Sequence, residues 1–127
     1  MTNGTIAFDT LSTSGQITGT AKSVDTDYVV NGSAKAWIDG TDAAALNDSF
    51  NIGSGTDHGT GDFSFAITSA MASADYLGFV TPNANGSRNG IHYDTRNTAS
   101  VLALIITGDD GSNSDKPYNA CSLGDLA

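Results

Sequence analysis

Short apolar segments separated by turn-forming dipeptides run along the chain from Tyr28 onward. Asn-Gly pairs stand at 31–32, 85–86 and 89–90, and Asp-Gly pairs stand at 39–40 and 110–111. Such pairs favour the tight turns that join antiparallel strands. The pattern therefore predicts eight short strands, at Tyr28–Val30, Ala34–Asp39, Ser49–Ile52, Asp62–Thr68, Tyr76–Val80, Ile91–Tyr93, Val101–Ile106 and Tyr118–Leu123.

The segment Asp62–Thr68 shows the clearest alternation in the chain. Phe63, Phe65 and Ile67 recur at every second position, which places them on one face of a strand that forms one wall of the core. The segment Val101–Ile106 is instead apolar throughout, as expected for a strand covered on both faces. We expect a second sheet, the N-terminal residues or another subunit to supply that cover.

Three further expectations concern the segments between these strands. Phe50 and Ile52 repeat the alternation and should share a face. The Gly-rich stretch Gly53–Gly61 reads as a long hairpin loop. The one expected helix is short, at Asp42–Asn47, with Thr41 or Asp42 as its cap.

Composition favours an all-β fold over a helical one. The chain of 127 residues contains no glutamate and is rich in Gly, Ser, Thr, Asn and Asp, which favour turns, caps and strands over helix interiors. We predict an antiparallel β-sandwich, jelly-roll-like, over residues 28–127. Residues 1–27 are polar with widely spaced apolar positions, and we expect them to form a short N-terminal arm that serves attachment or subunit packing.

Few long aliphatic side chains are available to build a core of this length. Alanine supplies much of the 39% of residues that are hydrophobic. Self-association can provide the missing burial. We therefore expect Val101–Ile106 and Trp37 to owe part of their burial to neighbouring subunits or to the arm.

Charge excludes several classes of partner. The net charge is −9, with 14 aspartates against five lysines and arginines. Affinity for phosphate backbones and anionic membranes comes largely from cationic contacts, so we expect no nucleic acid partner and no membrane insertion. The longest strongly apolar run, Val101–Ile106, is too short to span a bilayer.

The N-terminal residues point to synthesis and folding in a cytoplasm. The first residues lack the basic and apolar regions of a secretory signal peptide. Cys121 is the single cysteine, which excludes an internal disulfide, and we read it as a small core residue.

No constellation of residues indicates an enzyme. His58 and His92 lie in contexts typical of turns or strand ends, and no Gly-x-Ser-x-Gly motif is present. The aspartates read as turn caps rather than as a catalytic pair. We expect no catalytic residue and no cofactor.

A bound calcium ion is the one cofactor that we weigh as an alternative. The Asp109–Asp115 turn concentrates oxygen ligands, but it lacks the spacing and the late glutamate of a calcium-binding loop. We favour an exposed acidic turn that keeps the protein soluble.

Trp37 is the main candidate for a contact residue. Lys35, Trp37 and Asp39 share one face of their strand, whereas Ala34, Ala36 and Ile38 share the other. Trp37 is either a platform for a sugar ring or a residue buried in the domain or at a subunit interface, and we favour burial. The contact or interface candidates are Trp37, Lys35, Tyr76 and Tyr93.

Five segments carry a resemblance to a known family: Ser33–Trp37, Leu46–Asn51, Asp57–Asp62, Ala70–Tyr76 and Gly124–Ala127. In this order they resemble the C-terminal domain of bacteriophage tail-fibre-like and related virion proteins, especially from phages of marine bacteria. The resemblance runs from about Ala21 to the end, and its most specific parts are Lys-Ala-Trp and Gly-Thr-Gly-Asp. In the family this domain closes a longer fibre polypeptide, whereas here it begins almost at residue 1.

The resemblance implies a virion protein, commonly a homotrimer, with no catalytic residues to carry over. We expect an oligomeric knob of a tail fibre or spike that contributes to host adsorption and binds other virion proteins through its N-terminal arm. A capsid decoration or head-fibre protein is one alternative. A carbohydrate-binding module is the other, and a host surface glycan is a further candidate partner.

Overall fold

The computed structural model describes residues 15–18, 23–83, 87–92 and 96–127. Within these residues the chain is mostly β-strand with one short helix, which confirms the all-β prediction. The elements are β1 (Gln16–Thr18), β2 (Ser23–Asp25), α1 (Thr26–Gly32), β3 (Ala34–Gly40), β4 (Leu46–Phe50), β5 (Ile52–Gly59), β6 (Asp62–Ile67), β7 (Leu77–Pro82), β8 (Ser87–His92), β9 (Val101–Gly108) and β10 (Tyr118–Leu123).

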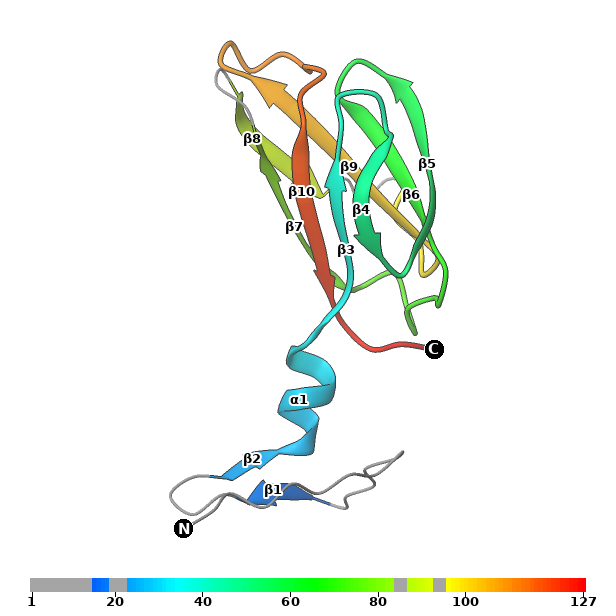
Figure 1. Cartoon of the computed structure of the whole chain (residues 1–127), viewed down its shortest axis with the longest axis vertical. Helices are drawn as coiled ribbons and strands as arrows, with labels where there is room; N and C mark the ends of the chain where they lie inside the picture. The colour runs from blue at the N-terminus through cyan, green and yellow to red at the C-terminus, as the bar shows by residue number, and fades with distance from the viewer. Residues whose placement is uncertain (1–14, 19–22, 84–86, 93–95) are drawn as a thin grey trace.

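Two four-stranded antiparallel sheets make up the main body of the chain (Figure 1). The first, here called the β3 sheet, has the order β4-β3-β10-β7. The second, here called the β9 sheet, has the order β5-β6-β9-β8. Three pairs of consecutive strands lie side by side within a sheet: β3 with β4, β5 with β6, and β8 with β9.

Side chains from both sheets form a single core. β6 and β9 contribute the largest share, through fully buried Phe63 and Phe65 on β6 and fully buried Leu102, Leu104 and Ile106 on β9. The ring of Phe63 on β6 stacks on the ring of Tyr118 on β10, with centroids 5.3 Å apart. Phe63, Phe65 and Ile67 are all buried, so the alternation read from the sequence is confirmed.

The expectation that Val101–Ile106 needs cover from a neighbour is wrong. β9 lies between β6 and β8, and Leu102, Ala103, Leu104 and Ile106 are fully buried by this chain alone. The continuous apolar pattern is therefore satisfied inside the domain. Self-association would therefore have to bury other residues.

The expected loop at Gly53–Gly61 is mostly strand. Most of it belongs to β5, which pairs with β6 through a tight turn at Thr60 and Gly61. Glycine is used here for close approach, because a Cβ at Gly55 would lie 2.2 Å from the carbonyl oxygen of Ala44 and 2.6 Å from the ring of Phe65.

Phe50 and Ile52 do not share a face, contrary to the sequence prediction. Asn51 between them has a φ of 59° and separates β4 from β5, which belong to different sheets. Its side chain accepts from the backbone N–H of Ser69 at 2.6 Å and donates to the carbonyl of Lys35 at 2.9 Å. Ile52 consequently packs against the core, while Phe50 is exposed.

Helix and strand are exchanged relative to the prediction in two places. Tyr28–Val30 lies within α1, whose N-cap Asp25 accepts a hydrogen bond from the backbone N–H of Asp27 at 3.0 Å. Residues 42–44 form a turn instead of a helix, and Leu46 already begins β4. The positive φ of Ala44, 56°, excludes a continuous helix there.

The N-terminal elements stand apart from the two sheets. β1 and β2 form their own antiparallel pair, and α1 connects them to β3 (Figure 1). None of the residues of α1 is buried. The predicted boundary between residues 27 and 28 falls inside this helix.

Candidate interaction surface

Four residues form a continuous row across the outer face of the β3 sheet. Trp37 on β3 lies opposite Phe50 on β4 and opposite Cys121 on β10. Cys121 in turn lies opposite Phe79 on β7. Directly opposed residues of antiparallel strands point to the same face. We call Phe50, Trp37, Cys121 and Phe79 the aromatic row.

The aromatic row is open to solvent. Phe50 is 54% exposed, Phe79 is 50% exposed and Trp37 is 37% exposed, while Cys121 is half-buried. Their strand neighbours Ala36, Ile38, Ala120 and Ser122 are buried on the opposite face. Trp37 is thus not buried within the domain, and of the two forms of burial favoured from the sequence only burial at a subunit interface is left open.

Charged residues lie on either side of Trp37 along β3. Lys35 and Asp39 are two positions away in opposite directions, and all three share one face as predicted, which is the outer face of the sheet. The ammonium group of Lys35 donates to Ser33 Oγ at 3.0 Å and contacts the carbonyl of Val30 in α1. Asp39 lies opposite Asp48 on β4 and accepts a hydrogen bond from Asn47 at 3.5 Å.

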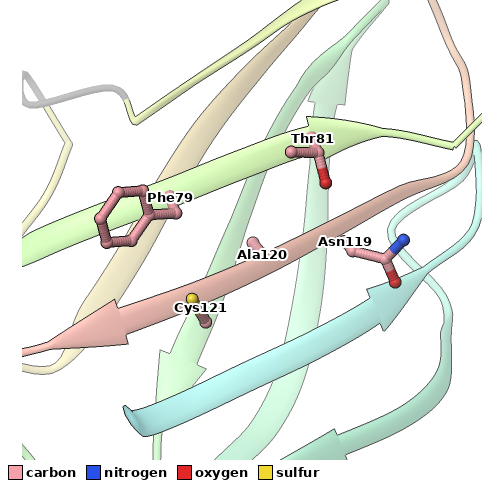
Figure 2. A pocket seen from close by; sticks show the side chains of 5 residues that line it. All are labelled: Phe79, Thr81, Asn119, Ala120 and Cys121. Carbon is pink, nitrogen blue, oxygen red and sulfur yellow. The ribbon is translucent and has the colours of Figure 1, made fainter. Parts of the chain in front are cut away.

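A shallow hollow lies beside the aromatic row between β7 and β10. Figure 2 shows Phe79 and Thr81 from β7 around it, together with Asn119, Ala120 and Cys121 from β10. Asn119 pairs with Thr81 on one side and with Asp39 on the other, so polar groups border the row on this side. The surface therefore has an apolar centre and a polar margin.

Tyr76 is a core residue and not a contact residue, which corrects the sequence prediction. It is 7% exposed, and its hydroxyl lies 2.5 Å from Asn97 Oδ1 and 2.7 Å from the carbonyl oxygen of Val101. Burial raises the pKa of Tyr76 to about 12, partly offset by the hydrogen bond to Asn97. Asn97 also donates to the carbonyl of Ala74 at 3.1 Å. These hydrogen bonds of Tyr76 and Asn97 connect the residues just before β7 to the start of β9.

The fourth candidate, Tyr93, lies outside the described residues. The sequence signals also missed Phe50 and Phe79 as members of the surface. Phe50 and Phe79 join the surface because their strands pair with β3 and β10, and a local sequence pattern does not show which strands will pair. The alternation at Phe79, between Gly78 and Val80, is the one signal that could have found its face.

His58 lies on β5, where its imidazole Nε2 is 2.8 Å from Ser64 Oγ on β6. The pair has the spacing of a nucleophile and a general base. Both side chains lie away from the core, however, and no carboxylate among the described residues bonds the ring. The nearest carboxylate along β6, Asp62, is paired with Arg96. The orienting group that such a dyad requires is missing from this part of the molecule.

Several aspartates cap turns, as the sequence predicts. The carboxylates of Asp57 and Asp110 accept from backbone N–H groups two residues ahead, at 2.8 Å and 3.0 Å. Asp115 accepts from the backbone N–H of Gly61 at 2.6 Å and so joins the turn between β5 and β6 to the loop before β10. Over the described ranges, no three side chains of His, Cys, Asp or Glu gather as a metal site.

The N-terminal elements carry a second set of exposed apolar residues. Ile17 and Val24 lie opposite each other in the β1–β2 pair and are both exposed. Tyr28, Val29 and Val30 of α1 are exposed as well. None of the helices in the described ranges is long and apolar enough to cross a membrane.

No protein-family model, curated protein or solved structure matches this chain.

Proposed function

We propose that this chain is a structural protein of a tailed-phage virion, in which the two sheets form an oligomeric β-sandwich knob of a tail fibre or spike that contributes to host adsorption. The observation that carries the proposal is the aromatic row, an apolar surface that nothing described in the chain covers. Exposed apolar patches of this kind mark surfaces that bind other molecules. The ordered resemblance of five segments to phage fibre domains supplies the virion context.

The β-sandwich is part of this proposal. Two facing four-stranded sheets with one shared core support it. The jelly-roll-like arrangement is part of it as well, and is supported by the pairings of β3 with β10, β7 with β10 and β6 with β9, which join strands that are not consecutive in the chain.

Self-association is also part of the proposal, and the resemblance implies a homotrimer. Because the chain by itself buries most of Val101–Ile106, the physical support now rests on the aromatic row and on the apolar residues of α1. Each copy carries a formal charge of −9. Apolar and strand contacts must therefore outweigh a repulsion that salt screens over about 8 to 10 Å.

A capsid decoration or head-fibre protein is the second candidate. The observation that favours it is the N-terminal segment, where β1, β2 and α1 extend from the end of the sheets and expose Ile17, Val24 and Tyr28–Val30 (Figure 1). Such a segment suits an arm that packs on another virion protein and leaves the domain outside. Attachment through the arm is compatible with both candidates.

Imaging of intact particles tests the proposal and separates its two forms. Density for this chain at a tail fibre or spike, at a few to a few tens of copies per particle, supports the first. Hundreds of copies on the head lattice support the second. Absence from purified particles that infect normally overturns both, and quantification of a known capsid protein in the same sample serves as the control.

We also propose that the protein has no catalytic activity. The paired His58 and Ser64 are the strongest contrary feature. Hydrolysis of host polysaccharide by the purified protein, lost on His58→Ala or on replacement of a single aspartate, would show that this part of the proposal is wrong.

A further inference from the structure

We infer that the outer face of the β3 sheet is the contact between two copies of this chain, which pack face to face about a two-fold axis running along the aromatic row. The inference goes beyond the proposed function, because it specifies how copies meet and does not depend on where the protein sits in a virion.

The aromatic row has the make-up of an interface centre. Four strands spaced about 4.8 Å apart carry the row over roughly 15 Å. Aromatic residues are enriched at the buried centre of protein interfaces, whereas charged residues are depleted there. Leu77 and Leu123, which lie opposite each other on β7 and β10 two positions before and after the row, extend the apolar surface.

The margin of the face is polar on the opposite side. Thr81, Asn119, Asp39 and Asp48 lie in successive strands two positions from the row. A polar margin around an apolar centre is the usual arrangement in non-obligate complexes. The partner is therefore expected to present an apolar centre with a matching margin.

Charge complementarity selects a second copy as that partner and fixes its orientation. Lys35 lies on one side of the aromatic row, and Asp39 and Asp48 lie on the other. If the two-fold axis runs along the row, the strands of the two facing sheets run in opposite directions. Lys35 of each copy then faces the partner's Asp39. An axis along the strands would set the acidic margins against each other. Only the axis along the row places opposite charges against each other, at two symmetry-related contacts between Lys35 and Asp39.

Lys35 is held in place for this contact. Its ammonium group has three N–H donors, of which one meets Ser33 Oγ and one meets the carbonyl of Val30. The remaining donor can reach a carboxylate on a facing sheet. α1 lies beyond the end of β3 and not over the β3 sheet (Figure 1).

A two-fold contact predicts an even number of copies. It builds a dimer, or it joins two trimers into a hexamer, whereas the resemblance alone implies three copies. The mass of the full chain in solution, measured by sedimentation over a wide concentration range, therefore tests the two separately. Species of two or six times 12.9 kDa support the inference. A trimer with no larger species, or a monomer throughout, overturns it.

Substitutions locate the contact and test its orientation. Trp37→Asp should abolish the two-fold association, and the matched control Thr56→Asp, exposed on β5 of the other sheet, should leave it intact.

Lys35→Asp and Asp39→Lys should each weaken association about tenfold, and the double exchange should restore most of it. Cooperative melting of each variant, at a concentration at which the wild type is monomeric, shows that the domain is folded. Failure of the double exchange to restore affinity overturns the orientation.

Cys121 gives an independent readout on the unmodified chain. Aligned sheets pack about 10 Å apart, whereas a disulfide needs Cα atoms within about 7 Å. A short bifunctional maleimide should therefore join Cys121 to the partner's Cys121 efficiently, while oxidation alone should not. Labelling of Cys121 should also slow as protein concentration rises. Protection that is independent of concentration would mean that another segment of the same chain covers the row, and would overturn the inference.

Host polysaccharide is the competing occupant. If Trp37→Asp and Phe79→Ala abolish binding to bacterial surface glycans but leave the mass in solution unchanged, the face is a glycan site and the inference is wrong. Neither result depends on whether the chain is found in a virion, so failure of the inference and failure of the proposed function can be told apart.

Discussion

The ring of Tyr118 on β10 stacks on the ring of Phe63 on β6, with an interplanar angle of 22° and centroids 5.3 Å apart. Tyr118 is fully buried, and the added Cβ of any residue replacing Gly40 would lie 2.5 Å from its ring. This contact joins the β3 sheet to the β9 sheet at the centre of the core. The hydroxyl of Tyr118 is buried with no hydrogen-bond partner among the described residues.

Tyr118→Phe should therefore leave the domain as stable as before or stabilise it by about 1 kcal/mol, because it removes a buried hydroxyl that has no partner. Tyr118→Ala should cost about 3–5 kcal/mol through the cavity it creates. Denaturant unfolding of both variants measures the two effects. A loss above about 1 kcal/mol in Tyr118→Phe would indicate that the hydroxyl is bonded after all.

The hydroxyl of Tyr76 is the opposite case, since it has two partners. Tyr76→Phe should destabilise the domain by about 1–3 kcal/mol, because Asn97 loses a buried hydrogen bond. Tyr28→Phe is the matched control: Tyr28 is 77% exposed, and its variant should stay within about 0.5 kcal/mol of the wild type. A double-mutant cycle with Asn97→Ala should show coupling, and additive losses would contradict the contact.

Stability should fall at high pH. Burial raises the pKa of Tyr76 to about 12 and raises that of Tyr118 further, whereas both titrate near 10 in the unfolded chain. Below pH 10 both tyrosines are neutral in both states, so their contribution is fully present. As pH rises from 10 towards 12 and beyond, the unfolded chain loses these protons first and the contribution disappears. Unfolding free energies at pH 9, 10 and 11 measure this slope, which should be shallower in a Tyr76→Phe/Tyr118→Phe variant; an equal slope would contradict the assignment.

Asp115 should matter more than the other exposed aspartates. Its carboxylate bonds the N–H of Gly61, 54 positions away, so Asp115→Ala should cost about 1–2 kcal/mol. Asp42→Ala, in the exposed turn before β4, is the control and should be near neutral. Chemical denaturation distinguishes them. Equal effects would show that the loop before β10 does not depend on this bond.

Gly55 should tolerate no side chain. The close approach of Ala44 and Phe65 predicts a loss of about 1–3 kcal/mol or more in Gly55→Ala, because the core edge must move. Gly53→Ala in the same strand is the matched control, since its Cβ would make only an ordinary contact, 3.5 Å from Thr68 Oγ1. Thermal melts of both variants decide the matter. Equal stability would mean that this segment is the loop its composition suggests.

Local patterns were informative for three of the strands. β3, β6 and β10 were predicted within a residue or so, because alternation or turn residues bound them. β5 was missed because glycine serves two opposite purposes, flexible loops and close backbone approach, and the sequence does not distinguish them. The exchange of helix and strand at Tyr28–Val30 has a similar origin, since β-branched residues in α1 are outweighed by the cap at Asp25.

The candidate surface likewise combines features that the sequence predicted with features that it did not. The sequence placed Lys35, Trp37 and Asp39 on one face, because that follows from the period of a strand. It also nominated Tyr76, which is buried because Asn97 and Val101 supply partners from 21 and 25 positions away. A local sequence pattern encodes neither the burial of a side chain nor a hydrogen-bond partner that lies so far along the chain.

By itself, the sequence determined the all-β character, the shared strand face of Lys35, Trp37 and Asp39, and the use of aspartates at turns, because each follows from the conformational preferences of a few consecutive residues. Only the tertiary structure decided that Phe50, Trp37, Cys121 and Phe79 form one row and that β9 is covered from within. Those two results depend on which strands are neighbours and in which register, and that choice is made by the packing of the core as a whole.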